Sequence, residues 1–305
     1  MEFQEFTQKA WADHGGDAQG VADRLGDGLD LVTEVAQLPA LAALIVHVRG
    51  EHLGQWSEGL EELRALSRHA CFDSESDPGR AVYRNMAILH YCQGDIADFE
   101  DCLERGQAGG EHPRESCAAR AYAIIASTLA GQARIEDARV AFDRALECAS
   151  YGPQQGDPAA LALAITGNNL ACTLEEKEDR SDAETELMKI AALTGRKYWE
   201  VAGDWKNVER AEYRLAMTMI AAGEAEAAIQ HASNCLSICE DNDADACERF
   251  FAQEALSLSH HTAGHTEEAA AARTLCADLL GQQEENMLAW CKTTLEKLDA
   301  RLGVT

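Results

Sequence analysis

The sequence predicts an all-α protein, a right-handed superhelical solenoid of about six antiparallel helix pairs with capping helices at both ends. Three observations favour this fold class. Alanine is abundant and only five of the 305 residues are proline, which favours helix. A helix–turn–helix pattern recurs along the chain. A single pair of such helices cannot bury its apolar face alone, so neighbouring pairs are expected to stack.

The repeat is marked by a turn residue that is usually small and is followed, five places later, by a second small residue. Most turns are preceded, and each is followed, by apolar or small residues three to four apart, which predicts an amphipathic helix on either side. Small residues at the helix contacts allow two backbones to approach closely. Phe99 and Glu178 break the small-residue rule. The turn positions are Gly54, Gly94, Ala133, Glu178, Gly223 and Gly264, with spacings of 40, 39, 45, 45 and 41 residues.

The chain divides into three predicted parts. We expect N-terminal capping helices in residues 1–37, the repeat array in residues 38–283, and a C-terminal capping helix with a short tail in residues 284–305. Solenoid ends must be covered, so caps are expected. Proline is tolerated only in the first turn of a helix, and every proline lies between units, just before a first helix: Pro39, Pro78, Pro113, Pro153 and Pro158.

The unit from residue 119 to residue 152 resembles a tetratricopeptide repeat. The segment GNNLA at residues 167–171 is also similar to the family's first helix. The resemblance covers roughly residues 40–290, with repeats longer than the common form, as in the kinesin light chain and bacterial peptide-receptor subfamilies. It implies a helical scaffold for protein interaction. The signature slots of the best unit are held by Tyr122, Ile125, Ala126, Ala138, Phe142, Ala145 and Leu146.

The resemblance also implies a concave groove, lined by the first helices, that binds an extended peptide or a partner helix. The chain has 53 acidic and 26 basic residues, yet the inward positions of these helices include four arginines. Arginine suits carboxylates and asparagine suits a peptide backbone. The predicted ligand is therefore an acidic peptide segment or a terminal carboxylate. The candidate binding residues are Arg84, Asn85, Arg120, Asn168, Asn169, Arg210, Tyr213 and Arg214.

Some members of the family, the heat-shock chaperone co-factors, hold a peptide's C-terminal carboxylate in a clamp of basic residues and asparagine. Asn169, Arg210 and Arg214 match three clamp slots. Two further slots hold Ala123 and Ser127, where the clamp has lysine and asparagine, so the clamp is incomplete. The alternative is that the arginines only pair with acidic residues of a neighbouring unit.

The composition excludes several classes of partner. The formal net charge is −27, whereas nucleic acids and anionic membranes require a basic surface. The N-terminus MEFQEF does not read as a signal peptide, and no apolar run reaches the ~18 residues of a membrane span. We expect a cytoplasmic protein whose eleven cysteines are reduced thiols.

The stretch NCLSICEDNDADACERF, residues 234–250, is the first of two metal-like patterns. Its cysteines are separated by three and seven residues, which does not match a zinc site. Its aspartates begin like a calcium loop, but Ala246 and Ala252 replace the required glycine and glutamate. We interpret the stretch as a junction whose aspartates cap a helix that begins near Ala246.

The second metal-like pattern is SHHTAGH, which contains His260, His261 and His265. Three histidines at a tight turn can bind nickel or zinc, but we interpret them as ordinary turn and groove residues. The motifs GxSxG, HExxH, GxGxxG and the Walker loop are all missing from the sequence. We therefore expect no catalytic residue, no metal site and no cofactor.

The leading functional hypothesis is a non-catalytic scaffold that binds a protein or peptide in its groove. One alternative is a peptide or small-molecule sensor that regulates another protein. Another is a metal- or redox-responsive protein that uses its cysteines and histidines. Self-association through Trp199 or Trp205 is a further alternative, opposed by the interpretation that both side chains are buried between repeats.

Overall fold

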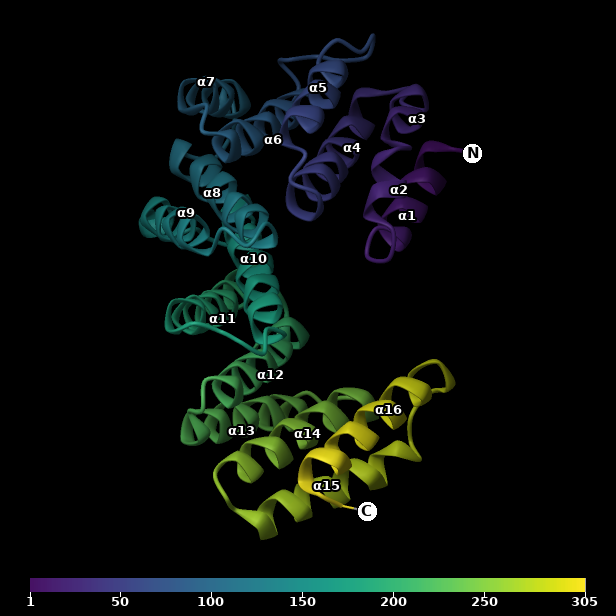
Figure 1. Ribbon diagram of the computed structural model, residues 1–305, viewed down its shortest axis with the longest axis vertical. Helices are drawn as coiled ribbons and strands as arrows, with labels where there is room; N and C mark the ends of the chain where they lie inside the picture. The colour runs from purple at the N-terminus through teal and green to yellow at the C-terminus, as the bar shows by residue number, and fades with distance from the viewer. Residues whose placement is uncertain (305) are drawn as a thin grey trace. The chain divides into compact units, whose positions relative to one another are not determined.

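A computed structural model describes residues 1–304, and within them the chain is all-α, with no β-strand. Its helices pack in adjacent pairs along the chain (Figure 1). The chain divides into two compact units, Met1–Leu163 (unit 1) and Ala164–Thr305 (unit 2). The division falls within helix α10, which spans Pro158–Glu175.

Unit 1 begins with three short helices and then forms helix pairs. The segment after α4 is a π-helix, η2, in which the Leu53 amide donates to the Val48 carbonyl five residues earlier. Before α10, the elements of unit 1 are α1 (Phe3–Asp13), α2 (Ala18–Ala22), α3 (Leu25–Asp30), η1 (Val35–Gln37), α4 (Leu38–Ile45), η2 (Val46–His52), α5 (Trp56–Leu66), α6 (Asp77–Gln93), α7 (Ile96–Gln107), α8 (Arg114–Gly131), α9 (Ile135–Cys148) and η3 (Ala149–Tyr151).

The helices that lie wholly in unit 2 are 15 to 21 residues long. After the C-terminal part of α10, unit 2 consists of α11 (Asp182–Ala202), α12 (Trp205–Ala221), α13 (Ala225–Asp241), α14 (Ala246–Thr262), α15 (Thr266–Leu280) and α16 (Glu285–Leu302). The last helix lies where a C-terminal helix was predicted, and it buries Cys291, Leu295 and Leu298.

Five of the six predicted turns adopt a left-handed backbone. Glycine reaches this conformation without the Cβ clash that other residues suffer, which explains its place after a helix. The sixth position, Glu178, lies instead in a longer connection between α10 and α11. The φ values are 63° at Gly54, 90° at Gly94, 56° at Ala133, 76° at Gly223 and 79° at Gly264.

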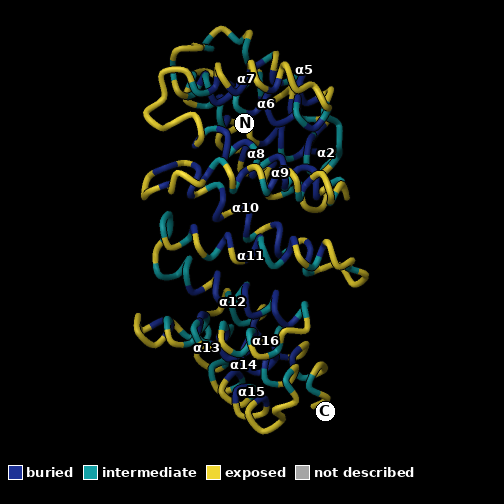
Figure 2. Tube along the Cα trace, turned by 90° about the vertical axis from the view of Figure 1, so that its left-hand side faces the viewer, coloured by how far each residue is buried: buried dark blue, intermediate teal, exposed yellow. Residues whose placement is uncertain are grey.

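The two helices of a pair are buried to different extents, as Figure 2 shows along the chain. First helices such as α8 carry buried residues around most of their surface, because α6 contacts α8 as well as its own partner. In unit 2, α12 likewise contacts α14. Second helices bury a single stripe, such as Ala138, Ala141, Phe142 and Ala145 of α9.

A close helix contact in unit 2 lies between Gly167 on α10 and Gly195 on α11. A Cβ atom added to Gly167 would lie 2.5 Å from the Ala191 carbonyl oxygen and 2.6 Å from the Gly195 nitrogen. Both neighbours are backbone atoms, so a side chain at residue 167 would force the helices apart. The small residue in GNNLA therefore has a direct packing role.

None of the helices in residues 1–304 combines the length and the apolar character required to cross a membrane.

Candidate functional site

Unit 1 contains a cavity of about 400 Å³ between the start of α6, the α7–α8 connection and α8, within the size range of roughly 300–1,000 Å³ typical of ligand pockets. Three arginines line it: Arg80 and Arg84 from α6, and Arg120 from α8. Two carboxylates, those of Asp77 and Glu111, also line it. The cavity therefore has one excess positive charge in a chain with a net charge of −27. We call it the arginine pocket.

The local sequence explains how the α6 arginines reach this pocket. Ser76 caps α6 by accepting a hydrogen bond from the Gly79 amide, which starts the helix just before the arginines. Arg80 and Arg84 are four residues apart and share one helix face. Arg84 donates to the Asp77 carboxylate at 3.1 Å and to the Gly106 carbonyl at 2.9 Å. A Cβ atom on Gly106 would lie 2.6 Å from Arg84 Cγ, so the glycine makes room for this side chain.

Several donors of the arginine pocket have no acceptor among residues 1–304. The Nε atoms of Arg80 and Arg84 are buried without a hydrogen-bond partner. The Arg120 guanidinium is half-buried and forms no ion pair or hydrogen bond with a described residue. Burial and the neighbouring Arg84 guanidinium lower the pKa of Arg120, because both disfavour its charged form. A bound anion would satisfy these donors and reduce the repulsion.

The structure brings together only two of the eight sequence-predicted binding residues, Arg84 and Arg120, in this pocket. Sequence reasoning missed Arg80, although its position one helical turn before Arg84 was a usable signal. Asn85 is buried and donates to the Ala81 carbonyl of its own helix at 2.8 Å. Its side chain therefore faces the core rather than a ligand.

The remaining predicted residues lie in unit 2. Asn168 donates to the Asn169 side chain at 3.2 Å, and Asn169 is exposed. Arg214 pairs with Glu175 at 2.6 Å. The Tyr213 hydroxyl donates to Glu254 at 3.0 Å. Burial raises the pKa of Glu254 to about 7, because this carboxyl has little solvent to stabilise its charge.

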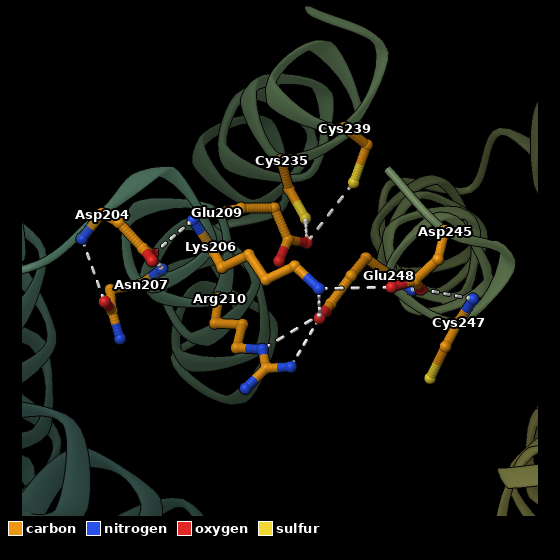
Figure 3. A network of polar contacts seen from close by, with 10 residues as sticks. All are labelled: Asp204, Lys206, Asn207, Glu209, Arg210, Cys235, Cys239, Asp245, Cys247 and Glu248. Carbon is orange, nitrogen blue, oxygen red and sulfur yellow. Dashed lines mark hydrogen bonds and ion pairs between the residues drawn. The ribbon is translucent and has the colours of Figure 1, made fainter. Parts of the chain in front are cut away.

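Arg210 pairs with Glu248, which also lies 3.7 Å from Lys206 (Figure 3). Glu248 is buried, whereas the Arg210 side chain is 65% exposed. Both arginines of the incomplete clamp, Arg210 and Arg214, are thus held in ion pairs with acidic residues from other helices. This arrangement agrees with the alternative that they pair within the repeat array.

Near Arg210, a buried carboxyl on α12 contacts two buried thiols on α13. Cys235 and Cys239 of α13 both donate to Glu209 Oε1 of α12, at 2.8 and 3.7 Å (Figure 3). Glu209 Oε2 has no partner among the described residues. Burial raises the pKa of Glu209 to about 7, and the nearby Glu248 adds to the effect.

One aspartate of the stretch at residues 234–250, Asp245, acts as predicted at the helix junction. Asp245 accepts hydrogen bonds from the Cys247 and Glu248 amides and caps α14, which begins at Ala246. Burial raises the pKa of Cys247 to about 12, so this thiol is protonated at neutral pH. A hydrogen bond with Cys239 and burial also raise the pKa of Cys235, so neither Cys235 nor Cys247 is an activated thiolate.

A histidine cluster that sequence reasoning did not find lies in unit 1. His14, His47 and His52 each place one ring nitrogen within 4.8 Å of the others. His260 and His265 of the SHHTAGH segment are only a pair, with Nδ1 atoms 3.4 Å apart. No local pattern links His14 to residues more than thirty positions away, so the first cluster depends on the tertiary fold.

No protein-family model matches the sequence, and a search of curated proteins found no similar chain.

Proposed function

We propose that the protein is a non-catalytic binding scaffold of tetratricopeptide-like helix pairs, and that unit 1 binds the carboxylates of an acidic peptide segment in the arginine pocket. The observation that carries the proposal is the set of arginine donors in the pocket. The Nε atoms of Arg80 and Arg84 are buried without a hydrogen-bond partner, and the half-buried Arg120 guanidinium forms no ion pair with a described residue. Buried polar groups are normally hydrogen-bonded, and a ligand carboxylate would supply the acceptor that these donors lack.

The chemistry of the pocket favours carboxylates over neutral ligands. Arg80 and Arg84 already share Asp77, at 3.8 and 3.1 Å, which holds their guanidinium groups in place before a ligand arrives. Preorganisation of this kind lowers the entropy cost of binding. Arg120 then offers a planar set of donors that matches a carboxylate with two hydrogen bonds.

The surrounding charge supports specificity. The three arginines give the pocket an excess positive charge in an otherwise acidic chain, so an anionic ligand is attracted to the pocket and not to the rest of the exterior. Arg210 and Arg214 in unit 2 have carboxylate partners already, and we assign them no ligand. We also assign no catalytic role to the pocket.

The test is direct binding of a fluorescein-labelled tetraglutamate peptide with a free C-terminus, measured by anisotropy at low salt. We expect Arg120→Met to weaken binding at least tenfold. The matched control is Arg144→Met, which removes an exposed arginine of the same unit whose partner is Glu147 at 2.8 Å. A tetralysine peptide serves as the ligand control.

Equal affinity of the wild type and Arg120→Met for tetraglutamate would refute the site. An equal loss in Arg144→Met would show that only general electrostatics is measured. Charge reversal at Arg210 or Arg214 is a poor test, because it places a like charge beside the carboxylate of Glu248 or Glu175 and destabilises unit 2.

A further inference from the structure

We propose that His14, His47 and His52 form a binding site for a divalent transition metal, with Zn²⁺ as the best match. The three side chains come from two separate segments of unit 1: His14 directly follows α1, and the other two lie on the π-helix η2. One ring nitrogen of each lies within 4.8 Å of the others. This proposal does not depend on the function proposed for the arginine pocket.

The distances suit a small cation bound by imidazole. Zinc–nitrogen bonds of about 2.0–2.1 Å in a tetrahedral site place two ligand nitrogens about 3.3 Å apart. His47 Nε2 and His52 Nε2 are 3.1 Å apart. The ring centroid of His14 is 4.8 Å from that of His47 and 5.1 Å from that of His52. A modest rotation of the His14 ring therefore brings the third nitrogen into position to bind the metal.

The π-helix creates half of the site. Residues five apart on an α-helix point about 140° away from each other at 3.6 residues per turn. A π-helix has hydrogen bonds between residues five apart, which brings His47 and His52 to the same face. The Leu53 amide makes such a bond, at 3.2 Å, to Val48. π-Helical segments are frequent at functional sites.

In His14 and His47, the ring nitrogen that would not bind the metal already has a hydrogen-bond partner, as in known metal sites. Metal-binding histidines usually donate their second ring N–H to a carboxylate or a backbone carbonyl. His47 Nδ1 contacts Glu51 Oε2 at 3.0 Å, and His14 Nδ1 contacts the Trp11 carbonyl at 2.6 Å. In both rings this leaves Nε2 unprotonated, and a metal would replace the hydrogen bond that His47 Nε2 shares with His52 Nε2.

Glu51 is itself held in place, so the orientation of His47 does not depend on an exposed carboxylate. Ser127 of α8 donates to Glu51 Oε1 at 3.0 Å, and Gln132 donates to the Glu51 carbonyl at 2.6 Å. A bound metal would connect the end of α1 to η2 and thereby to α8. The chain supplies three ligands, which leaves a fourth position for water or an exogenous ligand.

The test is calorimetric titration of Zn²⁺ into the full chain without an affinity tag, together with Co²⁺ titration followed by visible absorption. We expect one site per chain, and we expect His14→Gln and His52→Gln each to weaken it at least thirtyfold. His260→Gln is the matched control, because it removes one histidine of the other close pair. We expect it to leave the affinity of this site within threefold.

A second measurement separates loss of a ligand from loss of folding. Zn²⁺ should raise the melting temperature of the wild type and of His260→Gln but not of His52→Gln, whose metal-free melting temperature should match that of the wild type since His52 is exposed. Intense Co²⁺ absorption typical of a tetrahedral site should also vanish in His14→Gln. Zinc binding that survives His14→Gln and His52→Gln, or that is lost in His260→Gln, would overturn the proposal.

Discussion

Replacing Glu209 by glutamine should make unit 2 more stable at pH 8 and change its stability little at pH 4.5. Glutamine keeps the shape of the side chain and the oxygen that accepts from Cys235 at 2.8 Å. It removes the charge that the buried carboxyl must otherwise carry. Burial is the main reason that the pKa of Glu209 is raised.

The magnitude follows from the two pKa values. The unfolded carboxyl titrates near 4.5 and the folded one near 7. Between these values the folded state holds a proton that the unfolded state has lost, so the contribution of Glu209 to stability falls as pH rises and is constant above 7. At about 1.4 kcal/mol for each pH unit of this interval, the difference between the variant and the wild type should grow by about 3 kcal/mol.

The assay is urea unfolding at pH 4.5 and pH 8, followed by tryptophan fluorescence. Trp11 and Trp56 lie in unit 1 and should be changed to phenylalanine, so that the remaining tryptophans report on unit 2. Titrating groups that do not interact with Glu209 cancel when the variant is compared with the wild type at each pH. Stabilisation by Glu209→Gln that is the same at both pH values would refute the assignment of a buried, high-pKa carboxyl.

Glu212 provides a control on the same helix with the opposite sign. Its burial would raise the pKa, but hydrogen bonds from His231 and Arg196 lower it overall. Arg196 Nε lies 2.6 Å from one carboxylate oxygen and His231 Nδ1 lies 2.7 Å from the other. Glu212→Gln should therefore destabilise unit 2 at pH 8, and the loss should shrink as pH falls through the lowered pKa.

Two further predictions concern the backbone. Ala133→Gly should stabilise unit 1 by about 0.5–1 kcal/mol, measured by thermal unfolding. Ala133 has a φ of 56°, and relief of this strain exceeds the added entropy of the unfolded glycine. A destabilised variant would contradict the turn geometry. Gly167→Ala should destabilise unit 2 by about 2 kcal/mol or more, because its Cβ would meet backbone atoms at 2.5 and 2.6 Å. Gly281→Ala is the control: no atom lies within 4 Å of the added Cβ, so this variant should change stability by much less.

The helix pairs could be predicted because their signals are local. A left-handed turn selects glycine, and glycine stands at four of the five turns that adopt this backbone, including Gly94 and Gly223. Proline selects a first helical turn, and Pro78 lies at the start of α6. Both preferences act within a few residues, so the sequence shows them directly. Glu178 was the least typical of the predicted turn residues, and it lies in a longer connection instead of a left-handed turn.

The candidate sites were less predictable because they depend on distant partners. Arg84 and Arg210 have the same sequence context, an arginine on a first helix, yet only Arg84 faces a pocket with unsatisfied donors. Arg210 is neutralised by Glu248, which is 38 residues away and cannot be told apart from the many other acids. The histidine cluster was even harder to predict, because an α-helical period places His47 and His52 on different faces of the helix.

The buried cysteines have a consequence for how opening of each unit can be observed. Burial raises the pKa of Cys102 in α7 to about 11 and that of Cys92 in α6 to about 12, and it also raises the pKa of Cys276 in α15. An alkylating reagent requires a thiolate that it can reach, so these thiols react only when their helices separate. Pulsed alkylation read by peptide mass spectrometry therefore follows fluctuations of α6–α7 and of α15 independently, in one unmodified chain and without an engineered probe.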